Sequence, residues 1–585
     1  MRRSWISWVI VVFLVLAGLC LLASIALPYS TLKSLTDSLM PDHNFNSLKP
    51  WNTTIFKIIF GLGGTVFLGL AALTAFRRWN WIIHIWKRLW LDARRSFGLL
   101  RLHKQDLSFL VGVLAITFLA VVLRMERANA PMVHDEAYTY VAFSRSLFSA
   151  LTDYSKPNNH VLHSILVYFS TRTFGLGAWA VRLPAFLAGV LLVPASYWLA
   201  SRLYDRWTAL GTAFLVAWYP PLVAYANDAR GYTMVALFTI LTLALADHVR
   251  RDKNLFFWAL ISLFLALGLY TVPTMLFPFG VVFVWLFLEN QVSGPCPYRT
   301  KREFLGYWLA AGLGTAVLTL LFYTPILVFT NPKNFSANDM LARVPWKDLL
   351  VNLSARISDT WTEWTLRVPT AVLILLGIGC VLSLVLHLKV AKARTPLQVA
   401  ALLWFTALLL IERPNAEPRF WSFLMPLILI WASAGTFGLL QKVRLKFAPG
   451  ISLAAPVFGL LLVYGFWHAS WLVPQLPALW AERGKQENAV LFIQNHLHQD
   501  DLIVVSSPDD APVWYYSDLH GIPGAFFNTD TATYKRALVL VDIQWHQTLP
   551  WVLEDRGPDQ GQLNIESAHL LGTIGSIQVF EVPHE

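Results

Sequence analysis

Residues 108–140 read SFLVGVLAITFLAVVLRMERANAPMVHDEAYTY, in which a long apolar run is followed shortly by His134, Asp135 and Glu136. The run 108–124 is close to the roughly 20 apolar residues that a helix needs to cross a bilayer. Two adjacent carboxylates beside a membrane span need either water or specific partners. The stretch therefore predicts a membrane-spanning helix that ends at a charged segment on one side of the membrane.

The composition of the whole chain is that of a membrane protein. Of its 585 residues 56% are hydrophobic and 14% are charged, with 26 Trp and 38 Phe, whereas soluble domains carry roughly 25% charged residues. The net charge of +11 comes largely from short basic loops between apolar runs, such as RRWNWIIHIWKRLWLDARR (77–95) and HLKVAKAR (387–394). Basic loops of this kind indicate the orientation of spans, so nucleic-acid binding is not indicated. The three cysteines do not form the pattern of a disulfide framework.

Apolar runs that are candidate spans recur along the chain. The N-terminal run is longer than the apolar core of a signal peptide and lacks a clear cleavage site, which predicts a retained span. The runs are 5–27, 56–76, 108–124, 161–177, 183–203, 207–226, 231–247, 255–270, 274–289, 304–329, 368–387, 397–411, 420–440 and 450–470.

The positions of the basic loops indicate that one of these runs does not cross. If the N-terminal Met1-Arg2-Arg3 is inside, the later basic loops are also inside only when one run between 125 and 247 stays on the outer side. The run 161–177 is short and is interrupted by His163, Arg172 and two glycines, so we expect an outer-leaflet or partly embedded helix there. About thirteen transmembrane helices remain, and the outer segments are then 125–182, 226–232, 330–366 and the chain from 471.

Three parts of the chain are expected to differ in role. Residues 1–107 carry two extra N-terminal spans and a basic cytoplasmic loop, and residues 108–470 form a transmembrane core with the first outer loop 125–182. Residues 471–585 combine one stretch of helical spacing with short β-branched runs, which predicts a small extracytoplasmic α/β domain. These stretches are ENAVLFIQNHLHQ (487–499), DLIVVS (501–506), RALVLVDI (536–543) and IGSIQVFEV (574–582).

Two polar clusters lie in the predicted first outer loop. Asp135 either caps the following helix or forms, with Glu136, a carboxylate pair in which one pKa is raised, as a general base requires. His160 and His163 share one helical face and could bind a divalent metal together with His134, although polar anchoring at the membrane surface also accounts for them.

Two further polar clusters are expected on the same side. In NDARGY (227–232) Asp228 either caps a helix that begins at 229, with Arg230 reaching the interface, or joins Asp135 in a site. In ERPNAEPRF (412–420) Arg419 is either an interfacial anchor or a phosphate ligand, since its planar guanidinium suits phosphate oxygens.

In this order the motifs resemble the GT-C superfamily of membrane glycosyltransferases. The similarity is to the protein O-mannosyltransferase and lipid A aminoarabinose transferase group, that is, to dolichyl-phosphate-mannose-protein mannosyltransferase-like proteins. It rests on residues 125–290, where the Asp-Glu pair is followed by PNNHVLHSILVYFSTRTFGLGAWAVRLPAFLAGVLLVPASYWLASRLY (157–204) and by NDARGY, and on the later PRF. The two extra N-terminal spans and the C-terminal domain depart from the pattern.

The resemblance implies a GT-C fold and a transferase that uses a polyprenyl-phosphate-linked sugar. It implies catalytic roles for Asp135, Glu136 and Asp228 and phosphate contacts for Arg230 and Arg419. The acceptor is a protein, a glycolipid or a polysaccharide, and a divalent metal is an open option. We expect the bacterial inner membrane as location, with the site outside. The residues expected to bind substrate are His134, Asn159, His160, His163 and Tyr232.

The physical chemistry of such a transfer fits this arrangement. A lipid-borne donor keeps its sugar at the membrane surface, where Asp135 could take the proton of the acceptor as general base. Direct displacement would invert the anomeric centre. Two other classes remain open: a lipid or solute transporter, which would place charges near the bilayer midplane within inverted repeats, and a metal-dependent membrane hydrolase built on the three histidines His134, His160 and His163.

Overall fold

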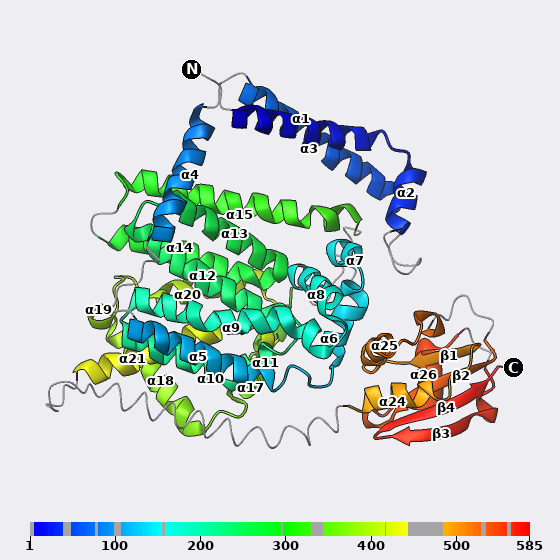
Figure 1. Ribbon diagram of the computed structural model, residues 1–585. Helices are drawn as coiled ribbons and strands as arrows, with labels where there is room; N and C mark the ends of the chain where they lie inside the picture. The colour runs from blue at the N-terminus through cyan, green and yellow to red at the C-terminus, as the bar shows by residue number, and fades with distance from the viewer. Residues whose placement is uncertain are drawn as a thin grey trace.

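Helices dominate the computed structural model of the chain, and a small sheet lies near its C-terminus (Figure 1). The predicted run 450–470 lies outside the described residues. The structure describes residues 5–38, 48–75, 80–98, 107–154, 158–293, 297–329, 343–415, 417–442, 484–527, 534–558 and 563–584.

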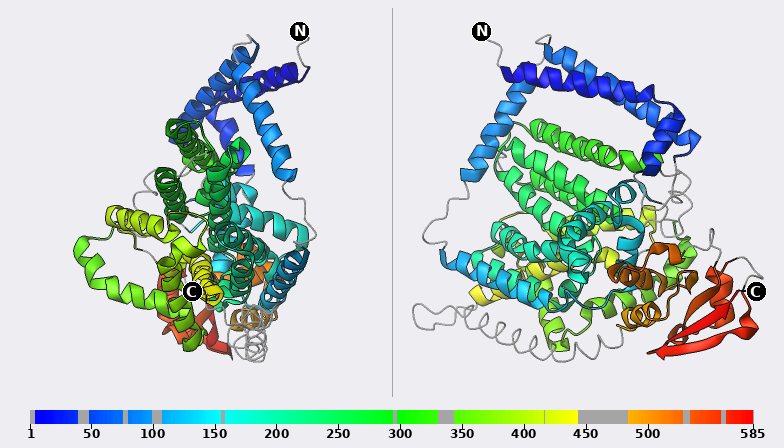
Figure 2. Two further views of the ribbon diagram at one scale, coloured as in Figure 1. Left: turned by 90° about the vertical axis from the view of Figure 1, so that its left-hand side faces the viewer. Right: turned by 45° about the vertical axis from the view of Figure 1, so that its right-hand side comes forward.

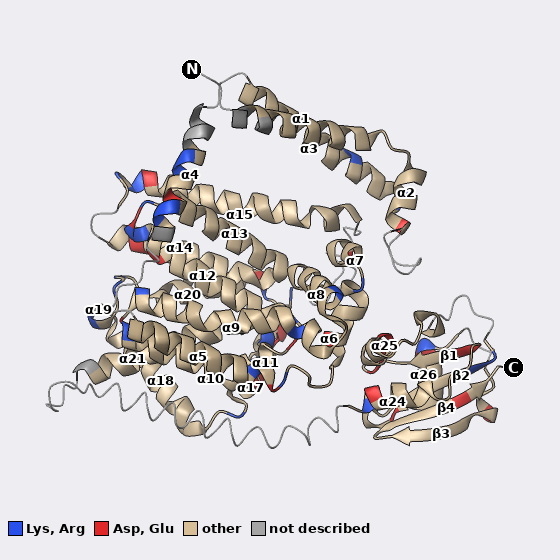
Figure 3. Ribbon diagram, in the orientation of Figure 1, with Lys and Arg blue, Asp and Glu red and all other residues tan. Residues whose placement is uncertain are grey.

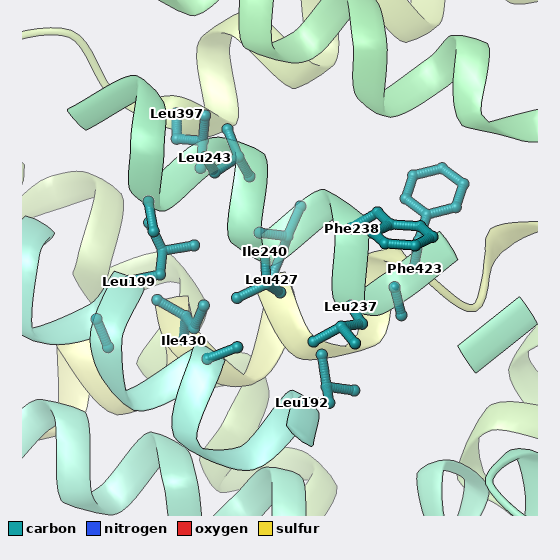
Figure 4. Packing of buried hydrophobic residues seen from close by; sticks show 14 of the residues in the cluster. Leu192, Leu199, Leu237, Phe238, Ile240, Leu243, Leu397, Phe423, Leu427 and Ile430 are labelled. Atoms are coloured by element: carbon teal, nitrogen blue, oxygen red, sulfur yellow. The ribbon is translucent and has the colours of Figure 1, made fainter. Parts of the chain in front are cut away.

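The core of the molecule is a bundle of apolar helices that lie side by side (Figure 1). Its helices are α5 (Leu107–Met125), α9 (Ala178–Leu203), α10 (Arg206–Trp218), α12 (Tyr232–Arg251), α13 (Leu255–Thr271), α14 (Leu276–Val292), α15 (Lys301–Phe329), α18 (Thr370–Val385), α20 (Leu397–Glu412) and α21 (Leu424–Lys442). Helix α12 is central, because 16 of its 20 residues are buried. Figure 4 shows part of the packing, in which Ile240 of α12, Leu199 of α9 and Leu427 of α21 belong to one buried cluster.

Several described helices meet the length and apolarity of a membrane span. There are six of them, or up to eight if each of two bent helix pairs forms one span. Helices α13, α20 and α21 are apolar but shorter. A polytopic α-helical membrane protein is therefore confirmed, while the number of thirteen spans stays a prediction. The six are α3 (Pro50–Ala75), α5, α9, α12, Pro273–Val292 and α15.

Most charged residues of the bundle lie near its two ends (Figure 3). At one end Asp247 of α12 pairs with Arg202, near the end of α9, at 2.9 Å. At the other end Glu136 pairs with Arg182, near the start of α9, at 2.5 Å. Since α9 carries both arginines, it runs the full length of the bundle.

Helix α8 (Val161–Phe174) does not run between the two ends. His160, just before it, accepts a hydrogen bond from the backbone N–H of Gly231, in the turn that also contacts Glu136. The carbonyl of Leu176, just after it, accepts a hydrogen bond from the hydroxyl of Tyr515 in the C-terminal domain, which docks on the same end. The chain therefore enters and leaves α8 at the end that carries Glu136.

The N-terminal helices form a hairpin that stands apart from the bundle (Figures 1 and 2). Helix α1 (Trp5–Ile25) packs along α3, and α2 (Tyr29–Ser38) joins them. The two axes approach closely at glycines: a Cβ atom on Gly64 would lie 3.0 Å from the carbonyl oxygen of Gly18. Asn52 of α3 contacts the bundle through a 2.7 Å hydrogen bond to the carbonyl of Val328. Helix α4 (Asn80–Gly98) leads on toward α5.

The C-terminal domain is a mixed sheet covered by helices. Strand order is β1-β2-β4-β3, with β1 parallel to β2 and the other pairs antiparallel. All residues of β1 are buried, as expected of a parallel strand that is covered on both faces. The predicted α/β domain is confirmed, and β3 is a strand that the sequence pattern missed. The elements are α24 (Lys485–Gln494), β1 (Asp501–Val505), α25 (Asp510–Leu519), β2 (Arg536–Asp542), α26 (Leu549–Arg556), β3 (His569–Ile574) and β4 (Ile577–Pro583).

Short elements complete the described chain. They are α6 (His134–Tyr138), the π-helical η2 (Thr139–Ser144), α7 (Leu147–Thr152), α11 (Pro220–Tyr225), η3 (Pro273–Met275), α17 (Trp346–Thr365), α19 (His387–Val390), η4 (Pro418–Trp421), η6 (Gly524–Phe527), η7 (Ile543–Trp545) and η8 (Ile565–Ser567).

Candidate active site

Three segments that are distant in sequence meet at one end of the bundle: α6, the turn 226–231 and η4. The turn lies between α11 and α12, and η4 follows α20. Proline stands at the first position of both α11 and η4. Proline suits the first position of a helical element, because its φ is already fixed near the helical value and its missing N–H would have no partner inside the helix there. The polar residues beside these breaks are thereby held at the end of the bundle.

Asp135 joins the three segments. Its Oδ2 lies 2.6 Å from Nη1 of Arg230, which follows the turn's Asp228, and 2.5 Å from Nη1 of Arg419 in η4. Its Oδ1 lies 3.5 Å from Nδ1 of His134. The pKa of Asp135 is held well below its usual range, by the hydrogen bond with His134 and by the two guanidinium groups. At neutral pH a carboxylate thus sits between two arginines, with 32% of its side chain exposed.

Glu136, the next residue, faces the interior. Its carboxylate pairs with Arg182 through Nε at 2.8 Å and Nη2 at 2.5 Å, and both side chains are 3% exposed. It also accepts the backbone N–H of Ala229 at 3.0 Å and that of Val133 at 3.3 Å. Glu136 therefore fixes the turn 226–231 against α6 and satisfies the start of that helix. The alternative in which Asp135 caps the helix is wrong, because α6 begins at His134.

Asp228 lies in the turn and has a buried Oδ1 that makes no hydrogen bond among the described residues. Burial and the negative charge of Glu136 raise the pKa of Asp228 to about 7. The alternative in which Asp228 caps a helix from 229 is wrong, because α12 begins at Tyr232 after Gly231. The site thus holds two partly buried carboxylates, Asp135 and Asp228, whose pKa values are shifted in opposite directions.

The other predicted residues surround Arg230. Its guanidinium contacts the side-chain carbonyl of Asn158 and lies 5.6 Å from the ring centre of Tyr232. The ring of Tyr232 packs edge-on against His160 at 4.9 Å. Asn159 instead donates to the carbonyls of residues 150 and 153, and so fixes the loop before α8. His160 and Tyr232 therefore position Arg230, whereas Asn159 is bound to its own loop.

The histidines predicted as metal ligands do not come together. Both ring nitrogens of His134 face carboxylates, and Nδ1 of His160 accepts the N–H of Gly231 at 2.8 Å. His163 is fully buried in α8 and has no hydrogen-bond partner among the described residues. In the described part of the chain no group of three or more His, Cys, Asp or Glu side chains could hold a metal ion. The histidine site is therefore not formed there.

Three residues of the site were not found from the sequence. Arg182 is a single arginine at the start of the apolar run 183–203. Because a charge buried at a membrane span needs a partner, its position in the sequence could have predicted an ion pair. Asn158 directly precedes Asn159 and His160, which the sequence predicted to bind substrate. Asp510, which contacts His134 at 3.2 Å, belongs to the C-terminal domain, and nothing in its local sequence indicates that contact.

The arrangement is suited to bind an anion. Arg230 and Arg419 converge on one carboxylate oxygen of Asp135. Guanidinium groups bind carboxylate and phosphate oxygens through the same planar set of donors. A phosphate would therefore compete with Asp135 for these two arginines.

Comparison with protein families finds a match over part of the chain. Residues 156–300 match the family described as dolichyl-phosphate-mannose-protein mannosyltransferase. The matched segment includes His160, His163, Arg182 and the turn 226–231, and it does not reach Asp135 or Arg419. A search of curated proteins finds no match.

Comparison with solved structures supports the fold. ArnT from Cupriavidus metallidurans, bound to undecaprenyl phosphate, matches with a TM-score of 0.50 at 13% identity, over 82% of this chain and 98% of that chain. Lower similarity is found to the oligosaccharyltransferase of Archaeoglobus fulgidus in the apo form (TM-score 0.47, 12% identity, 77% and 71% coverage). The arabinosyltransferase EmbB of Mycobacterium smegmatis gives a TM-score of 0.40 at 14% identity, with 82% and 45% coverage. The predicted GT-C fold, and the resemblance to this class of glycosyltransferases, are confirmed.

Proposed function

We propose that this chain, which has the GT-C fold, is a glycosyltransferase that moves a sugar from a polyprenyl-phosphate-linked donor to an acceptor at the membrane surface. The observation that carries the proposal is the carboxylate of Asp135 held between Arg230 and Arg419 at one end of an apolar bundle. ArnT, whose fold this chain shares, was solved with undecaprenyl phosphate bound. A lipid phosphate is the anion that such an end of a membrane bundle would meet.

In this proposal the two arginines hold the donor phosphate. The bond from the anomeric carbon to the phosphate oxygen breaks, and the electron pair leaves with the polyprenyl phosphate, whose negative charge grows. Arg230 is nearly buried and is oriented by Tyr232 and Asn158, so it is preorganised for that charge. Fixed donors aimed at developing charge stabilise the transition state more than the ground state.

Asp135 is then the general base. When phosphate draws Arg230 and Arg419 away, Asp135 loses two cations that lower its pKa, and it becomes a stronger base in the presence of the donor. It takes the proton of the acceptor as the acceptor attacks the anomeric carbon, which inverts that centre. Asp228, with its raised pKa, is the second catalytic carboxylate of the proposal.

The orientation that we propose puts the site and the C-terminal domain outside the cytoplasm, in a bacterial inner membrane. The opposite end of the bundle supports this, because its basic side chains outnumber the acidic ones. Positive charge marks the cytoplasmic ends of membrane helices. Arg202, Arg250 and Arg251 of that end pair with Asp247, and Arg250 also pairs with Glu289. Lys392 donates to the carbonyl of Ser201, and the backbone N–H of Arg394 donates to Glu289.

Sugar transfer by the purified full chain tests the function. Defined polyprenyl-phosphate sugars are offered with candidate acceptors, and wild type is compared with Asp135→Asn and Asp228→Asn. We expect each variant to lose about 10²–10⁴-fold in kcat, the usual contribution of a positioned acid–base group. Glu566→Gln, at an exposed position of the C-terminal domain, is the control and should match wild type. Full activity in both aspartate variants would refute the assignment, and a product of retained configuration would refute inversion.

Binding of undecaprenyl phosphate tests the phosphate site without any sugar. Arg419→Gln should weaken binding by about 10–100-fold, since a hydrogen bond to a charged group contributes about 1.5–3 kcal/mol. Asp135→Asn should bind at least as tightly as wild type, because the competing carboxylate is gone. Weaker binding by Asp135→Asn would contradict the competition.

A further inference from the structure

His134 lies between two carboxylates that come from different parts of the molecule. Its Nδ1 is 3.5 Å from Oδ1 of Asp135, its neighbour in α6. Its Nε2 is 3.2 Å from Oδ1 of Asp510, in the first turn of α25 in the C-terminal domain. Neutral imidazole has only one N–H, whereas the charged form donates from both nitrogens. An imidazole with a carboxylate at each nitrogen is therefore suited to the charged form.

The contact between His134 and Asp510 rests on an extensive interface. Arg145, just after η2, pairs with Asp518 of α25 through Nε at 3.0 Å and Nη2 at 3.1 Å. The hydroxyl of Tyr516 accepts the backbone N–H of Met132 at 2.9 Å, just before α6. These polar contacts involve residues that precede and follow His134 in the chain. They hold α25 against α6 and η2.

Apolar side chains fill the same interface. Tyr515 of α25 packs edge-on against Tyr140 of η2, with ring centres 5.7 Å apart. Both belong to one buried cluster that includes Ala137 of α6 and Ala229 of the turn 226–231. The C-terminal domain and the candidate active site thus share a hydrophobic core.

The loop that carries Asp510 is anchored inside its own domain. Asp509, the preceding residue, is buried and accepts a 2.7 Å hydrogen bond from Gln486 of α24. Asp510 itself accepts the backbone N–H of Ala511 at 2.9 Å, and its Oδ2 lies 3.4 Å from Nη2 of Arg556 in α26. Contacts within the C-terminal domain therefore hold Asp510 in the position from which it contacts His134.

The charges around His134 favour its protonated form. Hydrogen bonds to Asp135 and Asp510 raise the pKa of His134 to about 9. The ring of Tyr138 stacks on His134 at 5.8 Å, and Arg556 lies behind Asp510. Arg230 and Arg419 lie beyond Asp135 and contact its other oxygen.

We propose that the C-terminal domain is a working part of the active site, in which Asp510 is a positioning residue that acts on Asp135 through His134. Asp510 holds the imidazolium, and the imidazolium fixes Oδ1 of Asp135 while the arginines hold Oδ2. The role given to Asp135 rests on the function proposed above. The link from Asp510 to His134 does not. If the domain undocks, His134 loses one carboxylate and Asp135 loses its fixed neighbour.

The first experiment measures the charge of His134 without any substrate. Diethyl pyrocarbonate acylates neutral imidazole, and mass spectrometry of the peptide that contains His134 gives its rate in the full chain at pH 7.5. With a pKa of about 9 only about 3% of the ring is neutral at that pH. Asp510→Asn should raise the rate by about tenfold, and Asp510→Glu should restore much of the protection. Asp518→Asn removes one contact of the same interface, while the hydrogen bond between Tyr516 and Met132 and the apolar contacts keep α25 docked. Asp510 therefore still reaches His134, and this variant should keep the wild-type rate.

An unchanged rate in Asp510→Asn, or an equal rise in Asp518→Asn, would overturn the proposed link.

The second experiment measures the effect on Asp135. In Asp510→Asn the acid limb of the pH profile of kcat, measured with a polyprenyl-phosphate sugar, should move to higher pH, because Asp135 loses part of the interaction that lowers its pKa. Asp518→Asn should keep the wild-type profile. A profile of Asp510→Asn that superimposes on wild type would overturn the positioning role. If wild type transfers no sugar, the proposed function fails, while the acylation experiment still decides the link between Asp510 and His134.

Discussion

Replacement of Glu136 by glutamine should unfold the site rather than slow its chemistry. Glu136 accepts hydrogen bonds from Nε and Nη2 of Arg182 and from the backbone N–H groups of Ala229 and Val133. Each of its two oxygens serves two of these donors. In Glu136→Gln one oxygen becomes an amide NH₂ group, which cannot accept. Whichever way the amide turns, two donors then face a third donor.

The expected loss of unfolding free energy is about 3–5 kcal/mol. Two hydrogen bonds to a charged group are lost at about 1.5–3 kcal/mol each. The guanidinium of Arg182 is 3% exposed and loses its counter-ion, and breaking a buried pair from one side typically costs about 3–5 kcal/mol. The two estimates describe the same loss and agree.

Unfolding in mixed micelles with increasing SDS, followed by tryptophan fluorescence, measures this loss. Glu566→Gln on the exposed surface should stay within about 0.5 kcal/mol of wild type. The double variant Glu136→Gln/Arg182→Leu should lose less than the sum of the single variants, by about 1–3 kcal/mol. A Glu136→Gln protein that is as stable as wild type but inactive would refute the reasoning, and would make Glu136 a group of the chemistry itself.

Three further outcomes follow from the geometry. Gly231→Ala should lower stability by about 1–3 kcal/mol and impair transfer, because its Cβ would lie 2.4 Å from a threonine methyl group, whereas Gly306→Ala, with no atom within 4 Å, is the matched control. Because the pKa of Asp228 is raised to about 7, the folded chain between about pH 4 and 7 still holds a proton that the unfolded chain has released. The contribution of Asp228 to stability therefore falls as pH rises through that range. Asp228→Asn should remove this part of the pH dependence, and SDS unfolding at pH 4, 5.5 and 7 that shows the same dependence on pH in wild type and variant would contradict it. Tyr516→Phe leaves the buried N–H of Met132 without its acceptor, which should lower stability by about 1–3 kcal/mol and speed proteolysis between core and domain, and unchanged cleavage would speak against that contact.

Much of the fold follows from local patterns in the sequence. Apolar runs such as 108–124 became helices because a membrane-spanning segment must satisfy its own backbone hydrogen bonds. The interruption of 161–177 by His163 and Arg172 predicted a helix that stays at one end, and α8 begins and ends at the same end. Strand β3 was missed because none of its residues is fully buried and its sequence HLLGTI lacks clear alternation of apolar and polar residues. The helix predicted to start at 229 begins instead at Tyr232, because the turn before it is fixed by Glu136 from another segment.

The candidate site could be predicted only in part. Charged residues at the ends of apolar runs indicated Asp135, Arg230 and Arg419, and the structure brings these three together. The different environments of Asp135 and Glu136 could not be predicted, because adjacent residues on a short helix point in different directions and only the fold decides which one faces Arg182. The contact of His134 with Asp510 depends on the docking of a separate domain, which no local pattern encodes.

The separation of these contacts along the chain has a consequence for biosynthesis. Asp135 and Arg419 are 284 residues apart, and Met132 and Tyr516 are 384 apart. At about 5–20 residues per second a ribosome needs about 15–60 s to proceed from the first carboxylate to its arginine. During that interval the nascent chain is already inserted among the lipids of the membrane, and its carboxylate has no arginine of η4 beside it. Asp135 can pair with Arg419 only after the late helices have been inserted, and Asp510 can reach His134 only after the C-terminal domain has folded. The newly made protein therefore acquires its assembled site as one of the last events of its own synthesis.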